Sequence, residues 1–398
     1  MNGTPFSFAR RFDGVTGSAI REIFKLLARP GMISFAGGNP SPDALREDMI
    51  GDLASAVLQK DGKAILQYGA TEGYPPLVSS LTAYINDHLS IRAEAANILP
   101  VTGSTQAMDL LLKALIDPGD AVLVEDPTFL GNMQCIKLYQ AKIIPVPSDD
   151  DGILLSELER IVKLHKPKML YIIPTFQNPT GRTLHPDRRQ PIAEMAAAYR
   201  FVVAEDDPYR DLRYSGQTSP AIKTYDTTGY TAYLGSFSKT VSPGMRVGFI
   251  AAHEALIRKC TIGKQSSDLH TPNLTQAIVD LFLRENLLPA HIETLRGGYR
   301  AQMDTMLEAL ESFPSGTTYT RPQGGLFIFV TLPDGIDAVK LLKVCVERGV
   351  AYVPGTYFYA DGGHENTLRL NFSNSTAERI QTGMAILRQT IEEATEGR

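Results

Sequence analysis

The sequence predicts an α/β protein, with a mostly parallel sheet sandwiched by helices and a smaller α+β domain beside it. Between about residues 100 and 260, short and nearly continuous apolar runs alternate with segments of helical periodicity. This alternation is typical of a parallel sheet that helices cover on both faces. The length of 398 residues is also long for one core and suits two domains.

The expected strands of the sheet are short, apolar and bounded by polar or turn-forming residues. They are AVLVED (121–126), AKIIPVP (141–147), KMLYIIP (168–174), FVVAEDD (201–207), TAYLGSFSK (231–239) and RVGFIAA (246–252). Residues 103–116 and 187–200 are predicted helices between these strands, and 18–29 a first helix that Ser18 caps.

The C-terminal part predicts the smaller domain. GGLFIFVTL (324–332) and TLRLNFS (367–373) are expected strands on either side of a helix over 337–348. We therefore expect an N-terminal arm and helix over 1–44 that joins the small domain, a large domain over 45–290 and a small domain over 291–398.

Composition excludes several classes of function. The formal net charge is −5 and no basic cluster is present, so a nucleic-acid partner is not expected. No apolar run reaches the roughly 18–20 residues that span a bilayer, and the N-terminus lacks the core of a signal peptide. The 3 cysteines are widely spaced and the 7 histidines scattered, which indicates reduced thiols in a cytoplasmic protein without a metal site.

Polar side chains follow the ends of neighbouring strands. Asn178 comes after the strand at 168–174, Asp206 ends the strand at 201–207, and Ser236, Ser238 and Lys239 end the strand at 231–239. Ligands of open α/β sheets bind at the carboxyl ends of the strands. The sequence therefore predicts a ligand site at this edge.

Two segments are candidate phosphate binders. The helix at 103–116 places Met108, Leu111, Leu112 and Leu115 on one buried face, while Ser104 and Thr105 stand at its N-terminus. A helix N-terminus binds anions, although an ordinary N-cap explains these residues equally well. The second candidate consists of Ser236, Ser238 and Arg246. The planar guanidinium of Arg246 suits a phosphate. A surface turn is the alternative for it.

The segment SFSKTVSPGMRVGF (236–249) resembles the lysine segment of the fold-type I, class I and II aminotransferases, which use pyridoxal 5′-phosphate. Further segments agree in order: QYGATEGYPPL (67–77), GSTQAMDLLLKAL (103–115), QNPTG (177–181) and EDDPYRDL (205–212). The opening SAIREI and ISFAGGNPSPD, with the closing LRLNFS, are similar to the subgroup of 2-aminoadipate, kynurenine and broad aromatic or branched-chain aminotransferases. The resemblance covers essentially the whole chain.

The resemblance implies roles around the cofactor. Lys239 would hold it as a Schiff base and move the substrate Cα proton, and Asp206 would keep its ring nitrogen protonated. Asn178 and Tyr209 would hydrogen-bond its phenolate oxygen. Phe129 would stack on the ring, where many relatives carry a tyrosine whose hydroxyl is lost here. The residues implied to hold the phosphate are Ser104, Thr105, Ser236, Ser238 and Arg246, with Tyr68 from the other subunit of a homodimer.

The resemblance also implies the substrate contacts. Arg369 would bind the α-carboxylate bidentately, Asn178 would lie beside it, and Gly38 would let the N-terminal segment close over the substrate. Arg21 stands where some members bind a distal carboxylate, although a basic residue on an amphipathic helix is as often a solvated one.

Rival interpretations are weaker. Ser236-x-x-Lys239 matches the S-x-x-K of serine β-lactamases, but the S-D-N and K-T-G elements are absent from the sequence. The glycine-rich motifs of a Rossmann dehydrogenase and of a P-loop are absent too. Pyridoxal-phosphate-binding transcription regulators share the fold, but the similarity begins by residue 18, so no DNA-binding domain is expected before it.

The expected activity is a ping-pong transamination from an L-amino acid to a 2-oxo acid, with 2-oxoglutarate as the expected acceptor. A β-eliminating lyase or a decarboxylase on the same scaffold is the alternative. Donors of the 2-aminoadipate, kynurenine, aromatic and branched-chain types all remain open.

Overall fold

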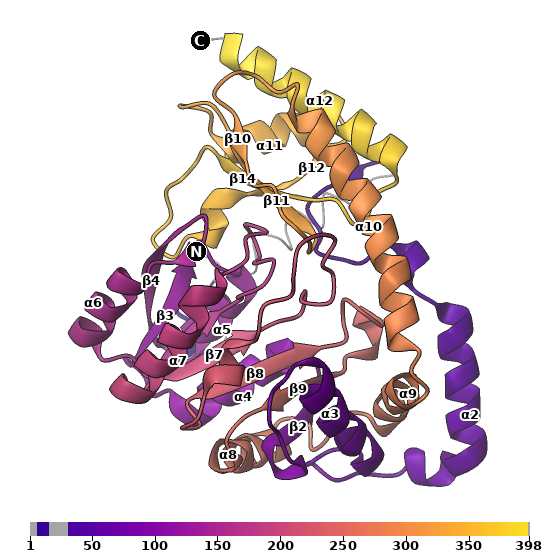
Figure 1. Cartoon of the computed structure of the whole chain (residues 1–398). Helices are drawn as coiled ribbons and strands as arrows, with labels where there is room; N and C mark the ends of the chain where they lie inside the picture. Colours follow the sequence, from indigo (N-terminus) through magenta and orange to yellow (C-terminus); the bar gives the residue numbers. More distant parts are fainter. Residues whose placement is uncertain (1–5, 16–30, 397–398) are drawn as a thin grey trace.

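An eight-stranded sheet forms the centre of the larger part of the molecule (Figure 1). The computed structural model describes residues 6–15 and 31–396 of the chain. The strand order is β2-β9-β8-β7-β6-β3-β4-β5. The strands are β2 (Ile98–Val101), β3 (Ala121–Asp126), β4 (Lys142–Asp149), β5 (Gly152–Ile153), β6 (Met169–Ile172), β7 (Val202–Asp206), β8 (Thr231–Ser236) and β9 (Gly248–Ala251).

The sheet is mostly parallel, which confirms the predicted fold class. β4, β3, β6, β7 and β8 run in one direction. β9 is antiparallel to both of its neighbours, β8 and β2, and β5 is antiparallel to β4. Apolar character alone does not distinguish the direction of a buried strand, so this reversal could not be predicted from the apolar pattern.

Helices cover both faces of the sheet, because its central strands are apolar on both sides. In β6, Met169 and Tyr171 pack into one cluster, and Leu170 and Ile172 pack into another on the opposite face. The helices of this part are α2 (Glu47–Ile65), α3 (Pro75–His88), α4 (Ser104–Leu115), α5 (Leu130–Leu138), α6 (Leu155–His165), α7 (Pro186–Tyr199), α8 (Glu254–Gln265) and α9 (Asn273–Arg284).

A smaller antiparallel sheet, ordered β10-β11-β14-β13, forms the second part. Helix α10 runs along one side of the molecule from the large part to the small one (Figure 1). The remaining elements are α10 (Leu288–Leu310), β10 (Thr318–Tyr319), β11 (Phe327–Thr331), α11 (Ala338–Glu347), β12 (Val350–Ala351), β13 (Val353–Pro354), β14 (Thr367–Asn371) and α12 (Ala377–Glu396).

The N-terminal segment is attached to the small sheet region. β1 (Ile33–Ser34) pairs in parallel with β12. Further along, the N–H of Phe35 donates to the carbonyl of Ala351, and the N–H of Asn371 donates to the carbonyl of Phe35. The predicted helix at 18–29 lies outside the described residues, as does Arg21.

Two absences hold for residues 6–15 and 31–396. No helix there is long and apolar enough to cross a bilayer. The same residues contain no group of three or more His, Cys, Asp and Glu side chains arranged to bind a metal ion.

A fully buried arginine fixes the loop that leaves β6. Arg189 on α7 is 0% exposed. Its Nη2 donates to the carbonyl of Pro174 at 2.9 Å, its Nη1 to the carbonyl of Pro220 at 2.8 Å and its Nε to the carbonyl of Leu184 at 3.3 Å. The carbonyl of Pro174 also accepts from the N–H of Leu184, so Arg189 adds a second bond there, and its bonds hold the start of the loop that carries Asn178.

We expect Arg189→Lys to lower the free energy of unfolding by about 3 kcal/mol, because an ammonium cannot reproduce the fork and leaves buried carbonyls unpaired. Urea unfolding measures the change. Arg160→Lys is the matched control, because Arg160 is 60% exposed and pairs with Glu157 on the surface, where about 0.5 kcal/mol is typical. Equal losses in both variants would contradict the role of Arg189.

Candidate active site

Lys239 lies just beyond the end of β8, where its amine is buried. Its Nζ donates to the carbonyl of Gly38 at 2.8 Å. Burial, together with the nearby charges of Arg369 and Arg246, lowers its pKa to about 8, and Asp206 acts in the opposite direction. A larger share of this lysine is therefore the neutral, nucleophilic amine at physiological pH than for an exposed lysine.

Asp206 ends β7 and is 4% exposed. Its Oδ2 accepts a hydrogen bond from the hydroxyl of Tyr171 at 2.9 Å. Its Oδ1 is buried and has no partner among the described residues. Burial raises the pKa of Asp206 to about 7. A buried acceptor without a donor is costly, and here it marks a place for a ligand donor.

Arg369 on β14 is 2% exposed and connects separate parts of the chain. Its Nη1 donates to Oδ1 of Asn178 at 2.7 Å, and its Nη2 donates to the carbonyl of Ala36 at 2.6 Å. Its guanidinium carbon lies over the rings of Phe327 and Phe358, at 4.3 Å and 5.0 Å from their centroids. Burial lowers its pKa to about 10, so it remains a cation at neutral pH.

Tyr209 lies in the same cluster. It is 5% exposed, its ring meets Phe327 edge-on at 5.8 Å, and its hydroxyl interacts with the side chain of Asn178. Burial holds its pKa far above the usual range, so the hydroxyl remains protonated at physiological pH. Asn178 and Tyr209 thus stand together beside Arg369.

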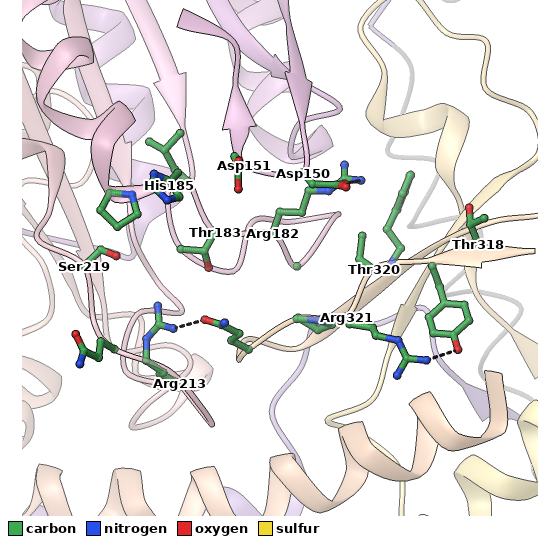
Figure 2. A pocket seen from close by; sticks show the side chains of 18 of the residues that line it. Asp150, Asp151, Arg182, Thr183, His185, Arg213, Ser219, Thr318, Thr320 and Arg321 are labelled. Carbon is green, nitrogen blue, oxygen red and sulfur yellow. Dashed lines mark hydrogen bonds and ion pairs between the residues drawn. The ribbon is translucent and has the colours of Figure 1, made fainter. Parts of the chain in front are cut away.

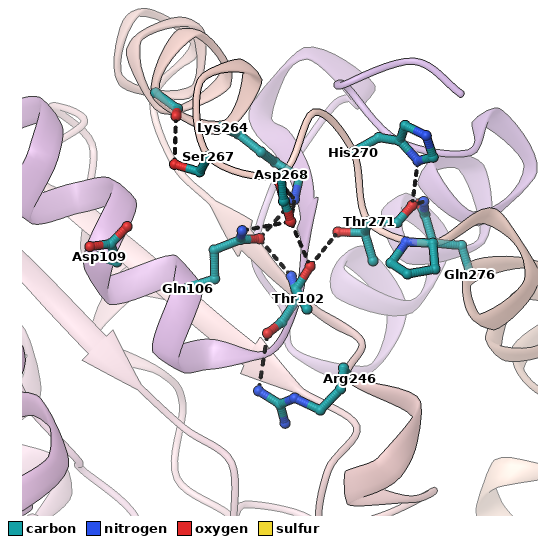
Figure 3. Close-up of polar contacts among 12 residues, drawn as sticks. Thr102, Gln106, Asp109, Arg246, Lys264, Ser267, Asp268, His270, Thr271 and Gln276 are labelled. Atoms are coloured by element: carbon teal, nitrogen blue, oxygen red, sulfur yellow. Dashed lines mark hydrogen bonds and ion pairs between the residues drawn. The ribbon is translucent and has the colours of Figure 1, made fainter. Parts of the chain in front are cut away.

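Arg246 lies at the N-terminus of α4 (Figure 3). It has left-handed backbone (φ 52°), its Nη2 donates to the carbonyl of Thr102 at 3.0 Å, and its Nη1 donates to the hydroxyl of Ser238 at 3.4 Å. Both partners are neutral oxygens. The cation is therefore available to an anion at the end of the helix, where the helix dipole also favours negative charge.

An ion pair between the buried Lys264 and the exposed Asp268 supports this corner of the site (Figure 3). Lys264, which is 0% exposed, donates to Asp268 at 2.9 Å and to Oε1 of Gln106 at 2.7 Å. Asp268 accepts from the hydroxyl of Thr102 at 2.9 Å. The pair thereby fixes the residue whose carbonyl orients Arg246.

Gly103 leaves the space that Arg246 occupies. A Cβ at this position would lie 2.3 Å from Nη2 of Arg246, and the backbone has φ of +83°. Glycine is favoured by both the positive φ and the close approach. From the sequence alone, Gly103 was expected only to begin the helix at 103–116.

The remaining predicted residues are placed as follows. Ser104 and Thr105 begin α4, and Phe129 is the half-buried residue before α5. Ser236 ends β8, where its hydroxyl accepts from the N–H of Ser238 at 3.2 Å. Tyr68 is 79% exposed, and its ring lies 6.1 Å from that of His270.

The described residues fit pyridoxal phosphate. Lys239 provides a buried amine of lowered pKa, Asp206 an unpaired acceptor for a ring N–H, and Arg246 with the start of α4 a place for a phosphate. Three cations, Lys239, Arg246 and Arg369, face one carboxylate in this cluster. That surplus suits a phosphate together with a substrate carboxylate.

A cleft of about 720 Å³ lies outside this cluster, beside the boundary between the two sheets (Figure 2). Its arginines are already engaged by the protein. Arg182 pairs with Asp150 at 2.6 Å, Arg321 lies 3.2 Å from Glu311, and Arg213 stacks over Phe176 at 4.7 Å. None of the predicted site residues lines this cleft.

The structure adds residues that sequence reasoning missed. They are Tyr171, Ala36, Gly103, Phe327 and Phe358. Tyr171 and the two phenylalanines read as ordinary core residues, and Ala36 contributes only its carbonyl. The GG pair of RPQGGLF gave the one sequence cue, a loop of special conformation directly before Phe327.

Comparisons with known proteins agree over nearly the whole chain. Residues 30–387 match the family described as aminotransferase class I and II. Aromatic-amino-acid aminotransferase 1 of Thermococcus litoralis is 41% identical, over 97% of this chain and 94% of that protein. The 2-aminoadipate transaminase of Thermus thermophilus is 39% identical, over 97% of this chain and 96% of that protein.

Solved structures show the same similarity. The kynurenine aminotransferase of Pyrococcus horikoshii, crystallised in complex with PMP, superposes with a TM-score of 0.93 at 40% identity. The match covers 97% of each chain.

Gly103→Ala should weaken binding of the expected cofactor by about ten-fold or more, because the new methyl group displaces Arg246. Fluorescence titration of the cofactor-free protein measures the dissociation constant. Gly119→Ala is the matched control, since Gly119 also has positive φ (+93°) but nothing lies within 4 Å of its added Cβ. Equal weakening in both variants would show that backbone strain, and not the contact with Arg246, is responsible.

Proposed function

Because the chain belongs to the class I and II aminotransferases, which makes it a pyridoxal-phosphate-dependent transaminase, we propose that it transfers the amino group of an aromatic, 2-aminoadipate-type or branched-chain L-amino acid to 2-oxoglutarate. One observation carries the assignment of the site. The amine of Lys239 lies in one buried cluster with Arg369, Arg246 and Asp206. The names of the relatives supply the donor classes.

When bound, pyridoxal phosphate supplies an aldehyde that exchanges with amino groups and a ring that accepts electrons from the substrate Cα–H bond. Arg369 binds the α-carboxylate of the substrate through its planar fork. The neutral amine of Lys239 takes the proton from the substrate Cα and returns it later, as general base and then general acid. Its lowered pKa suits both tasks at neutral pH.

Other residues of the cluster would orient the cofactor and keep water away from Arg369. Asp206 would accept a hydrogen bond from the ring N–H of the cofactor, and Asn178 and Tyr209 would donate to its phenolate oxygen. Phe327 and Phe358 both pack against the guanidinium of Arg369, which keeps water from it and strengthens its attraction for a carboxylate. The first product leaves as a 2-oxo acid before the second 2-oxo acid enters, which gives ping-pong kinetics.

A homodimer with shared sites is part of the proposal. Apolar side chains near Tyr68 are exposed, namely Leu66 at 74%, Ile262 at 60% and Leu269 at 43%. Exposed apolar residues beside a predicted shared-site tyrosine favour cover by a second copy. Light scattering tests this state, and a stable monomer at working concentration would contradict it.

Turnover should depend on 2-oxoglutarate, and Lys239→Ala should lower kcat by at least about 10⁴-fold because it removes the amine that moves the Cα proton. Time-point assays of product formation, with 2-aminoadipate, kynurenine, phenylalanine and leucine as donors, measure the dependence on 2-oxoglutarate and the fall in kcat. Ammonia or carbon dioxide released without an acceptor would favour a lyase or a decarboxylase. Full activity in Lys239→Ala would refute the assignment of the site.

The two arginines proposed for the substrate should differ in their effects. Arg369→Lys should lower kcat/KM for every donor by about 100-fold, since a point charge cannot replace the bidentate fork. Arg21→Ala should lower it for 2-aminoadipate and spare leucine and phenylalanine. Steady-state kinetics with these donors is the measurement, and an equal effect of Arg21→Ala on both groups would remove the role proposed for Arg21.

A further inference from the structure

Tyr171 reaches Asp206 because of the register of two central strands. β6 and β7 are parallel neighbours, and Tyr171 is paired with Ala204. Asp206 lies two residues beyond Ala204, so its side chain is on the same face of the sheet as that of Tyr171. The hydroxyl of Tyr171 bridges this diagonal and donates to Oδ2 of Asp206 at 2.9 Å.

The hydroxyl of Tyr171 remains a hydrogen-bond donor at every relevant pH. The residue is 0% exposed, and burial together with the charge of Asp206 raises its pKa well above the ordinary value. The buried side chain of Asn132 on α5 also interacts with the hydroxyl. Tyr171 is therefore held in place from its own strand and from a covering helix.

The two oxygens of Asp206 have different surroundings. Oδ2 is bound by Tyr171, whereas Oδ1 has no partner among the described residues. We infer that Tyr171 is a positioning residue for transamination: its hydroxyl holds Oδ2 of Asp206, fixes the carboxylate plane and leaves Oδ1 for the ring nitrogen of the cofactor. The inference rests on the role proposed for Asp206.

The same bond also supports the charge of Asp206. Burial and, to a smaller extent, the negative charge of Asp207 raise the pKa of this carboxyl, which lies at about 7. The hydrogen bond from Tyr171 and the charge of Lys239 act in the opposite direction. Without the hydroxyl, Asp206 would hold its own proton more readily and would be a weaker acceptor for the ring N–H.

Tyr171→Phe tests the inference in the holoenzyme, because it removes one oxygen and keeps the ring. We expect kcat to fall about ten-fold with KM changed less than about two-fold. The pH midpoint of the visible absorption of the bound cofactor should move upward, because a ring nitrogen that holds its proton less firmly withdraws less charge from the rest of the ring. A purely structural role would lower stability without moving this midpoint.

Tyr233→Phe is the matched control. Tyr233 lies on β8, is 2% exposed and directs its hydroxyl to Oδ2 of Asp207 at 3.4 Å. Tyr233→Phe removes the same hydroxyl oxygen from another strand of the same sheet, next to Asp207 instead of Asp206. We expect its kcat and absorption midpoint to equal those of the wild type. A change as large as that of Tyr171→Phe would overturn the inference.

A double mutant separates the possible failures. In an Asp206→Ala background, Tyr171→Phe should have no further effect on kcat, because the hydroxyl acts through the missing carboxylate. An undiminished effect there would overturn the inference, as would wild-type kcat and midpoint in Tyr171→Phe alone. Wild-type activity in Asp206→Ala alone would instead remove the role proposed for Asp206.

A second replacement covers the case in which Tyr171→Phe does not fold. 3-Fluorotyrosine at position 171 keeps the hydroxyl and makes it a stronger donor. The absorption midpoint should then move downward, opposite to the direction expected for phenylalanine. An upward or absent shift would overturn the inference.

Discussion

The buried guanidinium of Arg369 is the interaction on which the arrangement of the site depends. A cation that is 2% exposed needs partners for its donors. It finds them in Asn178 of the large sheet region and in Ala36 of the N-terminal segment. Lys239 donates to Gly38 of that same segment, so the side chains of Arg369 and Lys239 are both positioned by one stretch of backbone.

Much of the architecture could be predicted from the sequence, because buried parallel strands appear in it as continuous apolar runs. β3 coincides with AVLVED, and α4 and α7 fall within a residue of their expected bounds. β9 was expected as a strand but not as an antiparallel one, and β2 was not anticipated. Direction and pairing depend on contacts between distant residues, which local periodicity does not encode.

The residues of the candidate site were likewise only partly predictable from the sequence. Residues whose chemistry is conspicuous, such as Lys239, Asp206 and Arg246, could be named because polar groups at strand ends have little packing purpose. Tyr171 and Gly103 could not, because a strand tyrosine and a glycine before a helix have common structural explanations. Their importance lies in a diagonal across two strands and in the space beside one guanidinium, both of which exist only in the folded chain.

The pairing of β1 with β12 has a consequence for biosynthesis. Ile33 is bound to Val350, more than three hundred positions away along the chain, and contacts of such separation close late in folding. During translation the large sheet can therefore assemble before β12, the strand that pairs with β1, has been made. Arg369 lies further along the chain still, so the candidate site can be completed only after this late strand has been made.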